Sequence, residues 1–457
     1  MNIIICGAGQ VGYSIANQLS QQGHSITVID KTSSDIQKIN DNLDVKGIVG
    51  IATYPSVLDL ADAKNTDMII AVTRNDETNM IVCQIAHSLF NVSRKIARIR
   101  SKEFLNPSYS NLFSKAHLPI DIIISPEYEV SKSLFRKIEA PGAIESFPFA
   151  DDTVRLVEIN MDKKCQLVNT PLERLTKSFS DLNANVLGVQ RDDKFLILKK
   201  KDVLLENDKA FILTDSKQVE RTMKVFGKEE KISDKFLIIG AGNIGLDLAK
   251  FLENHPNNPR IKMIEKNEER AQFVANELNE TMVIKGDGLD ENILKEVNLE
   301  EIDTVLCITD DDEVNLMSAL LCKKKGIKRV IAIANSHNYS LLQSSLKIDD
   351  IVDPRMTTVS TILKHVHKGK IDSVFTLDDG EFEIIQAKVL ENSELLNETI
   401  ENSSIPDGIR IGLIVRDKKV FVPKKNFQFE LNDIVIVLSA RKQLNKVEQL
   451  FRISEYY

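Results

Sequence analysis

Short runs of apolar residues recur along the first part of the chain, and polar stretches with helical spacing separate them. Apolar runs bounded by polar turns are typical of strands that a parallel sheet buries on both faces. The same series returns in the second part of the chain, so the sequence contains an internal repeat. The expected strands are residues 3–6, 25–30, 67–73 and 95–99 in the first half and 236–239, 261–265, 303–309 and 330–334 in the second.

A further strand in each half ends at a proline, in Ser125-Pro126 and in Asp353-Pro354. Strands that alternate with helices form a parallel sheet with helices on both faces. The expected fold class is therefore α/β, with two Rossmann-like parallel-sheet domains.

One more helix is expected to leave each of these domains, over about residues 129–138 and 357–367. In the first of the two helices, Val130, Leu134 and Ile138 recur at helical spacing. Such an apolar stripe belongs either to the core of the chain or to a contact with a partner subunit.

A small strand-rich module of α+β type follows each helix, and the two modules align without a gap over their middle parts. Residues 186–191 match residues 411–416, and residues 206–208 match residues 431–433. The segment 227–231 between the halves is charged, as expected of a solvated linker. The chain is thus a tandem duplication, with expected domains at residues 1–124, 141–226, 233–352 and 371–455.

A glycine-rich loop follows the first strand of each half, and its pattern is Gly-x-Gly-x-x-Gly both times. The first loop is Gly7–Gly12 and the second is Gly240–Gly245. In this motif the first glycine permits a tight turn, the second lets a pyrophosphate approach the backbone, and the third lets helix and strand pack closely. The phosphates meet free amides at the N-terminus of the helix.

An acid ends the second strand of each half, Asp30 in the first and Glu265 in the second. An acid at this place accepts a hydrogen bond from a ribose 2′-hydroxyl and repels a 2′-phosphate. We therefore expect the first half to prefer NAD(H) over NADP(H), although Lys31 lies next to Asp30. The alternative interpretation is a glycine turn in an α/β fold that binds no nucleotide.

The composition narrows the setting of the protein. The chain has 457 residues, 42% of them hydrophobic, and a formal net charge of −8, which gives no support to nucleic-acid binding. No apolar run approaches the roughly 20 residues that span a bilayer, and no secretory segment opens the chain, so a cytoplasmic location is expected. The five cysteines are scattered and are expected to be buried, small apolar residues rather than metal ligands.

The order of these elements resembles the TrkA family, the peripheral NAD-binding regulatory subunits of the bacterial Trk potassium uptake system. The resemblance rests on both glycine loops, on residues 71–73 with 76–80, on Ile96-Ala97-Arg98, and on the strand 410–416. It implies RCK N-terminal (KTN) domains followed by RCK C-terminal domains. It also implies a homo-oligomer, most readily a tetramer, that docks on a TrkH or TrkG type membrane subunit through protein contacts, without inserting into the membrane. Nucleotide binding to this ring would gate potassium flux.

The nucleotide contacts that the resemblance implies fall on matching positions of both halves. In the first half the glycine loop would hold the pyrophosphate, Asp30 the adenosine ribose, and Arg98 would face the phosphates. Thr73 would line the next loop, and it could also cap the following helix. Arg98 could instead form a surface ion pair. The implied contacts are Gly7, Ala8, Gly9, Gln10, Val11, Asp30, Thr73, Arg74 and Arg98, and then Gly240, Ala241, Gly242, Asn243, Ile244, Glu265, Gly286, Asp287, Thr309 and Asp310.

The second site departs from the first in its charges. Ile333 stands where the first half has Arg98, and the acidic run 310–312 stands where the first half has Arg74. The loop after the third strand also differs, with residues 49–52 apolar and residues 285–288 polar. We therefore expect the second site to lack one phosphate-facing cation and to differ in affinity or in preferred nucleotide.

Three functions remain open from the residues alone. A regulatory subunit binds NAD(H), ATP or ADP without turnover, and no catalytic or metal-binding residue is expected in it. A dehydrogenase would need an acid or base beside the nicotinamide, and the seven histidines form no constellation with acids that recurs in both halves. A free-standing nucleotide sensor without a membrane partner is the third possibility.

Overall fold

A computed structural model of the chain separates into two compact units, Met1–Leu134 with Ser233–Leu363, and Phe135–Ile232 with Lys364–Tyr457. Part of the expected linker (229–231), the end of the expected second module (452–455) and residue 367 lie outside the described residues. The structure describes residues 1–163, 165–179, 181–192, 194–228, 233–335, 339, 346–366, 371–377, 381–403, 405–406 and 408–451.

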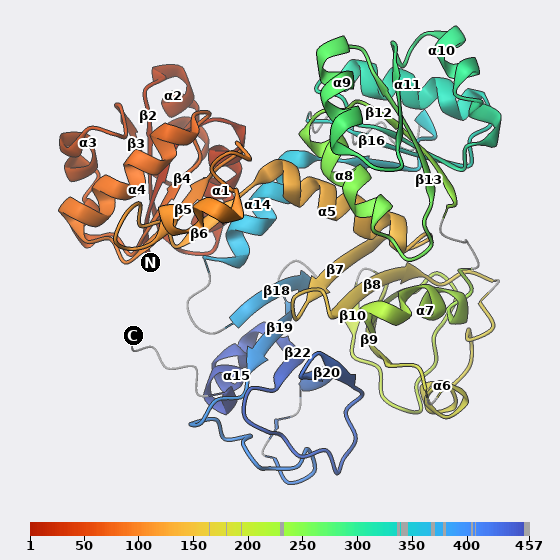
Figure 1. Ribbon diagram of the computed structural model, residues 1–457. Helices are drawn as coiled ribbons and strands as arrows, with labels where there is room; N and C mark the ends of the chain where they lie inside the picture. Colours follow the sequence, from red (N-terminus) through yellow and green to blue (C-terminus); the bar gives the residue numbers. More distant parts are fainter. Residues whose placement is uncertain are drawn as a thin grey trace. The chain divides into compact units, whose positions relative to one another are not determined.

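The first unit contains two parallel sheets with helices on both faces, so the predicted fold class is confirmed (Figure 1). The first sheet has the strand order β3-β2-β1-β4-β5-β6, and all of its neighbouring strands are parallel. Its elements are β1 (Asn2–Cys6), α1 (Gln10–Gln21), β2 (Ser25–Asp30), α2 (Ser33–Asn42), β3 (Lys46–Val49), α3 (Pro55–Leu60), β4 (Met68–Ala71), α4 (Asp76–Phe90), β5 (Arg94–Arg98), β6 (Ile122–Ile124) and α5 (Pro126–Glu139).

The second sheet repeats the first in the order β14-β13-β12-β15-β16-β17. Strand order reverses between the first strand of each half and the fourth, and such a switch point is where open α/β sheets bind ligands. The elements are β12 (Lys235–Ile239), α8 (Asn243–Glu253), β13 (Arg260–Glu265), α9 (Glu268–Glu277), β14 (Met282–Lys285), α10 (Glu291–Glu296), β15 (Thr304–Cys307), α11 (Asp312–Lys324), β16 (Arg329–Ile333), β17 (Asp350–Val352) and α14 (Pro354–Lys364).

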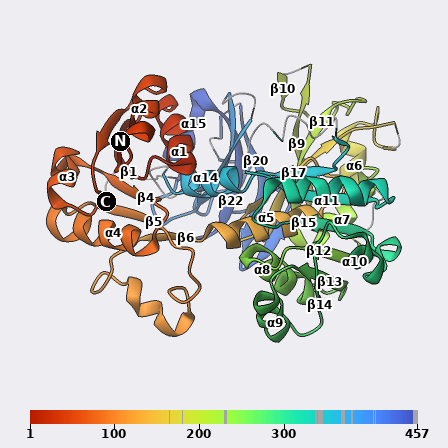
Figure 2. The ribbon, with the colours of Figure 1, turned by 90° about the horizontal axis from the view of Figure 1, so that it is seen from above.

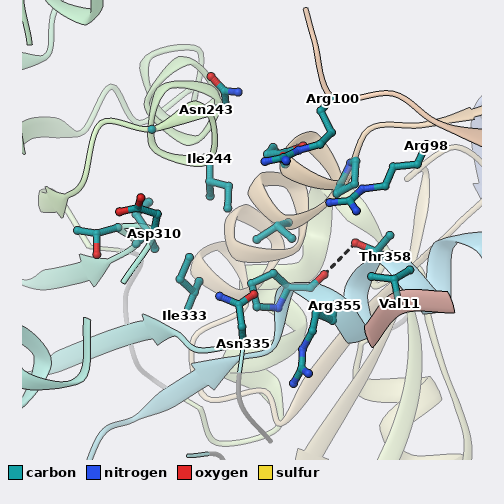
Figure 3. Close-up of a pocket in the computed structure, with 17 residues that line it drawn as sticks. Val11, Arg98, Arg100, Asn243, Ile244, Asp310, Ile333, Asn335, Arg355 and Thr358 are labelled. Atoms are coloured by element: carbon teal, nitrogen blue, oxygen red, sulfur yellow. Dashed lines mark hydrogen bonds and ion pairs between the residues drawn. The ribbon is translucent and has the colours of Figure 1, made fainter. Parts of the chain in front are cut away.

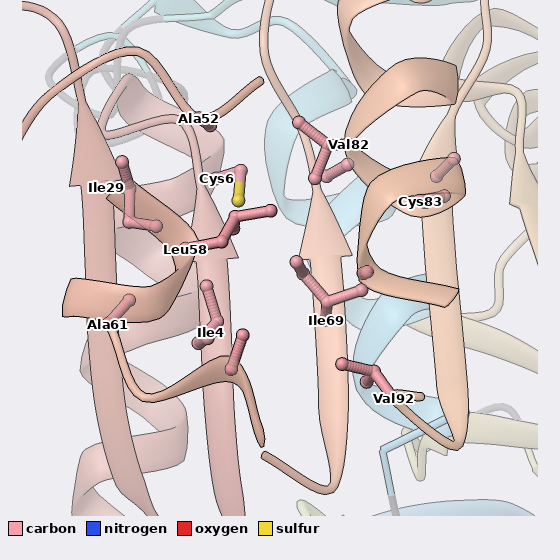
Figure 4. Packing of buried hydrophobic residues seen from close by; sticks show 14 of the residues in the cluster. Ile4, Cys6, Ile29, Ala52, Leu58, Ala61, Ile69, Val82, Cys83 and Val92 are labelled. Atoms are coloured by element: carbon pink, nitrogen blue, oxygen red, sulfur yellow. The ribbon is translucent and has the colours of Figure 1, made fainter. Parts of the chain in front are cut away.

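The apolar runs form strands where the sequence predicts them because both faces of each sheet are covered. In the first sheet, Ile4 and Cys6 point to one face and pack under α3 and α4 against Leu58 and Val82 (Figure 4). All five cysteines are buried and free, as expected. Burial raises the pKa of the Cys83 thiol to about 12.

Helix α5 contacts the second Rossmann domain of the same chain. Ser131 Oγ donates to the Ile244 carbonyl at 3.0 Å, and the rings of Tyr128 and Phe251 lie 5.5 Å apart. Both views place α5 beside α8, and place α14 beside the first domain near α1 (Figure 2). The stripe Val130, Leu134 and Ile138 is buried within this chain, which decides the question that the sequence leaves open.

The second unit contains two five-stranded sheets of one topology, β10-β9-β11-β8-β7 and β21-β20-β22-β19-β18. Described neighbouring strands are antiparallel in both. The elements are β7 (Glu145–Phe149), β8 (Val154–Asn160), α6 (Leu172–Ser178), β9 (Ala184–Arg191), β10 (Lys194–Leu196), β11 (Lys209–Asp215) and α7 (Val219–Val225), then β18 (Ile371–Leu377), β19 (Phe382–Lys388), β20 (Ile409–Arg416), β21 (Lys419–Phe421), β22 (Ile434–Ala440) and α15 (Leu444–Phe451).

The same buried ion pair stabilises both small modules, which supports the duplication. Arg191 donates to both oxygens of Asp208, each at 2.7 Å, and Arg416 donates to both oxygens of Asp433, each at 2.7 Å. Asp208 and Asp433 are almost fully buried, and these bidentate contacts compensate the buried charges.

The two modules share one apolar core within the second unit, in which Leu187 and Phe211 pack with Leu413 and Ile436. Arg410 of the second module donates to the Leu187 carbonyl of the first at 3.1 Å. In the part of the chain that the structure describes, no helix combines the length and the apolar character that crossing a bilayer requires.

Candidate nucleotide-binding site

The first glycine loop has the geometry that its motif predicts. Gly7 has φ +116°, a conformation that favours glycine, and its N–H donates to the Ile29 carbonyl at 2.8 Å. A Cβ at Gly12 would lie 1.9 Å from the Gly7 carbonyl oxygen, so helix α1 approaches β1 only because Gly12 has no side chain. At Gly9 a Cβ would meet no atom within 4 Å. The middle glycine is thus the one that borders open space, where the motif places a pyrophosphate.

The second loop repeats these features. Gly240 has φ +109°, and a Cβ at Gly245 would lie 2.2 Å from the Gly240 carbonyl oxygen. A Cβ at Gly242 would again meet no atom within 4 Å. Both loops therefore leave their helix N-termini accessible to an anion.

The acid at the end of the second strand holds each loop in place. Asp30 accepts hydrogen bonds from Ala8 N at 2.7 Å and from Thr32 N at 2.8 Å, one to each oxygen. Glu265 accepts from Ala241 N at 2.9 Å and from Asn267 N at 2.8 Å in the same way. Each carboxylate oxygen has a further lone pair, so these contacts leave room for a ribose hydroxyl.

A buried asparagine, which sequence reasoning did not single out, organises the loop after the fourth strand. Asn79 Oδ1 accepts from Thr73 N at 2.9 Å and from Thr73 Oγ1 at 2.7 Å, and Asn79 Nδ2 donates to the Arg98 carbonyl at 2.8 Å. Asn315 makes the same bonds to Thr309 and to the Ile333 carbonyl. Recurrence of this asparagine in both halves was the only signal of its role.

The alternative role of Thr73 as a helix cap is wrong. The N-cap of α4 is Asn75, whose side chain accepts from Thr78 N at 2.7 Å. The Thr73 hydroxyl instead donates to Asn79, and this hydrogen bond fixes Thr73 at the carboxyl end of the parallel strands. Arg74, the next residue, is exposed.

Arg98 lies at the end of β5 with most of its side chain covered, and the surface ion pair is not what the structure shows. The Arg98 Nε is buried without a hydrogen-bond partner among the described residues, which also include no acid paired with it. Burial, followed by the nearby Arg100 cation, lowers the pKa of the Arg98 guanidinium. A desolvated cation of this kind is suited to bind a phosphate.

A pocket of about 290 Å³ opens at the second glycine loop, and both Rossmann domains line it (Figure 3). Arg98 and Arg100 of the first half and Arg355 at the start of α14 are among its lining residues; Arg100 is paired with Glu127 at 2.7 Å and Arg355 with Asp353 at 2.9 Å. Ile333 is apolar, as the sequence predicts, and Arg98 of the first half lies among the residues that line this pocket. Aligning the two halves could not show this, because an alignment pairs equivalent positions and does not show which side chains of one half lie at the loop of the other.

The three carboxylates of the acidic run after β15 have different positions relative to the pocket. Asp310 lines the pocket. Asp311 caps α11 by accepting from Glu313 N and Val314 N, and Asp312 accepts from Asn335 N at 2.9 Å. Only one of the three carboxylates thus lines the pocket.

The loops after the third strands keep the difference that the sequence predicts. Asp287 pairs with Lys266 at 2.9 Å, and a Cβ at Gly286 would press on the Ile293 side chain at 2.8 Å. In the first half, Val49 and Ile51 are exposed at this place. At this loop the first half is thus apolar, whereas the second half carries the paired charges of Asp287 and Lys266.

These features define a class of protein, one with paired Rossmann domains of the dinucleotide-binding type and small antiparallel modules. Solved structures share this fold. The chain resembles the crystal structure of the GsuK RCK domain, with a TM-score of 0.58 and 16% identity over 99% of this chain and 95% of that one. It also resembles the GsuK channel bound to NAD, with a TM-score of 0.60 and 16% identity over 99% of this chain and 79% of that one.

Sequence comparison identifies the family. The TrkA-N domain matches residues 3–126 and 236–354, and the TrkA-C domain matches residues 384–452. The Trk system potassium uptake protein TrkA of Azorhizobium caulinodans is 39% identical over 454 residues, which cover 99% of each chain. Those of Halomonas elongata and Vibrio alginolyticus are 33% and 34% identical and cover 99% and 100% of both chains. The chain belongs to the TrkA family, as the resemblance in its sequence indicates.

Proposed function

We propose that this chain is the nucleotide-binding regulatory subunit of a Trk potassium uptake system. In this proposal NAD(H), or an adenine nucleotide such as ATP or ADP, binds at the glycine loops and changes potassium flux through a membrane subunit of TrkH or TrkG type. The observation that carries the proposal is the pair of glycine loops, each with its middle glycine facing open space. Curated relatives named as Trk system potassium uptake proteins support the physiological setting.

At the first site we assign the pyrophosphate to the loop from Gly7 to Val11 and the adenosine ribose to Asp30. Thr73, with Arg74 beside it, would border the nucleotide from the loop after β4. Arg98 would face the phosphates, because its covered guanidinium has no acid partner among the described residues.

At the second site we assign the same roles to the loop from Gly240 to Ile244, to Glu265 and to Thr309 with Asp310. Gly286 and Asp287 would border the adenosine. Since Arg98 lines the pocket at this loop, it is also placed to meet the phosphates of a nucleotide bound there. A ligand regulates a protein only if it binds two of its states with different affinity, and we propose that a nucleotide in contact with both halves does so by holding them together.

We further propose binding without turnover. Among the described residues that line the pocket there is no histidine, lysine or cysteine, and Glu127 is paired with Arg100 at 2.7 Å. This set of side chains suits charge recognition and offers no free acid–base pair for hydride chemistry.

The remaining parts of the proposal concern organisation. We propose Rossmann domains at 1–124 and 233–352, each followed by a small module at 141–226 and 371–455. We also propose that the chain forms a homo-oligomer, a tetramer in the resting complex, on the cytoplasmic face of the membrane. Contact with the membrane would pass through the transporter subunit, because the acidic net charge of −8 disfavours binding to anionic lipid.

Potassium flux into vesicles that contain the membrane subunit tests the function. Gly9→Asp places a carboxylate where a Cβ meets no protein atom, so the variant should fold and assemble but lose the flux response to NAD(H). Gln22→Asp is the control, because Gln22 is exposed with a negative φ at the end of α1 and lies outside the loop. A normal response of Gly9→Asp would show that the first site is not the sensor.

Nucleotide preference is tested by calorimetry on Gly242→Asp, in which only the first site remains. NADH should bind this variant more tightly than NADPH, because Asp30 repels a 2′-phosphate. Equal affinities would contradict the assignment of Asp30 to the ribose.

A further inference from the structure

The second glycine loop is held from both sides by charged side chains. Ala241 N donates to Glu265 at 2.9 Å, and the Ala241 carbonyl accepts from Arg270 Nε at 2.7 Å. Arg270 Nη2 also donates to Asn243 Oδ1 at 3.2 Å, and the guanidinium lies 5.1 Å from the ring centroid of Phe273. Arg270 thus places a cation on the carbonyl of Ala241, the residue whose amide Glu265 binds.

The first half has no arginine at this place, although Lys31 follows Asp30 as Lys266 follows Glu265. The residue aligned with Arg270 is Asp35, whose ion pair is with Lys38 at 3.9 Å on the same helix. The acid itself is held alike in both halves, since Asp30 and Glu265 each accept from two backbone amides. The two sites therefore differ in charge at the adenosine end, where the first half has the acid Asp35 and the second half has the cation Arg270.

The charge of Arg270 is available to a ligand. Within the described chain no acid forms an ion pair with it, whereas its neighbour Lys266 is paired with Asp287 and Glu268 is paired with Lys285. A guanidinium has five N–H donors, of which Arg270 uses two on the loop. Three donors remain for an anion.

We propose that Arg270 makes the second site accept an adenine dinucleotide that carries a phosphate on its adenosine ribose, a ligand that the first site rejects. This inference rests on the proposed function, because it assumes nucleotide binding at the second loop. An arginine close to the acid at the end of the second strand is the means by which Rossmann folds accommodate a 2′-phosphate. The Arg270 guanidinium offsets the repulsion between that phosphate and Glu265, whereas Asp35 adds to the repulsion from Asp30.

Calorimetry with NAD+ and NADP+ on the full chain tests the proposal. In Gly9→Asp, which leaves the second site, NADP+ should bind within about threefold of NAD+. Adding Arg270→Asp should weaken NADP+ relative to NAD+ by about tenfold or more, the effect of losing one charge-assisted contact. Arg270→Lys should keep most of the affinity for NADP+ relative to NAD+. NAD+ and NADP+ are compared within one variant, so any general effect of Arg270 on the position of the loop changes both affinities and cancels in their ratio.

The first half supplies the converse variant. In Gly242→Asp only the first site remains. Adding Asp35→Arg to this variant should reduce the ratio of NAD+ affinity to NADP+ affinity by about tenfold. If Gly9→Asp binds NAD+ but its ratio is unchanged by Arg270→Asp, the role of Arg270 is wrong while the proposed function stands. If Gly9→Asp binds neither nucleotide, the second site is not a nucleotide site, and both proposals fail for this half.

Discussion

Replacing Asn79 with alanine should both destabilise the first Rossmann domain and weaken its nucleotide site. Asn79 is fully buried in α4 and connects the loop at Thr73 to the end of β5 at Arg98. The substitution removes an acceptor from the Thr73 N–H and a donor from the Arg98 carbonyl. It keeps the helix, because alanine is the residue that helices favour most.

The size of the effect follows from these lost partners. A buried polar group left without its hydrogen bond costs about 1–3 kcal/mol, and two such groups are left here. The better helix propensity of alanine returns less than about 1 kcal/mol. We therefore expect a loss of about 1–5 kcal/mol in the free energy of unfolding. We also expect about a tenfold loss of nucleotide affinity at the first site, because Arg98 is no longer fixed.

Urea denaturation followed by circular dichroism measures the stability, and calorimetry in the Gly242→Asp background measures the affinity. Glu77→Ala, an exposed position on the same helix, is the control and should stay within about 0.5 kcal/mol of the parent. Asn315→Ala should give a similar destabilisation in the second half. If Asn79→Ala unfolds like its control, the hydrogen bonds of Asn79 do not hold the loop, and the reasoning is refuted.

Three further predictions concern packing. Gly12→Ala should cost about 3 kcal/mol or more, because its Cβ would lie 1.9 Å from a backbone oxygen, while Gly9→Ala should change stability by less than about 0.5 kcal/mol; thermal unfolding that shows equal losses would contradict this. Asp433→Ala should cost about 2–3 kcal/mol because Arg416 keeps only its ion pair with Glu430, and Asp208→Ala should cost at least as much in urea denaturation because it leaves Arg191 without an acid partner among the described residues; a clearly smaller loss for Asp208→Ala would contradict this. Burial raises the pKa of all five thiols, so a thiol reagent at pH 8 should label none in the native chain within minutes and all after denaturation; rapid native labelling would show that a cysteine is accessible.

Much of the fold could be predicted from the sequence because its signals are local. Apolar runs predict the parallel strands, glycine spacing predicts both loops, and the gap-free match of 186–191 with 411–416 predicts the second module. In each case the residues that carry the signal are close in the chain. Stereochemistry acts at that range, as the positive φ of Gly7 and Gly240 shows.

The charge of the second site could not be predicted in this way. Alignment pairs Ile333 with Arg98, but it does not show that Arg98 lines the pocket at the loop around Asn243. It counts Asp312 as a site charge, whereas the fold turns that carboxylate to Asn335.

The sequence by itself therefore determined what each half is: a Rossmann domain with a glycine loop, an acid that faces it and a small module behind it. Only the tertiary structure decided which side chains meet at each loop. It places Asn79 under Thr73, Arg98 in the pocket at the other half's loop and Arg270 on the Ala241 carbonyl. The physical reason is that backbone preferences act between neighbours in the chain, whereas the charge of a site is a sum over side chains that folding brings together from distant segments.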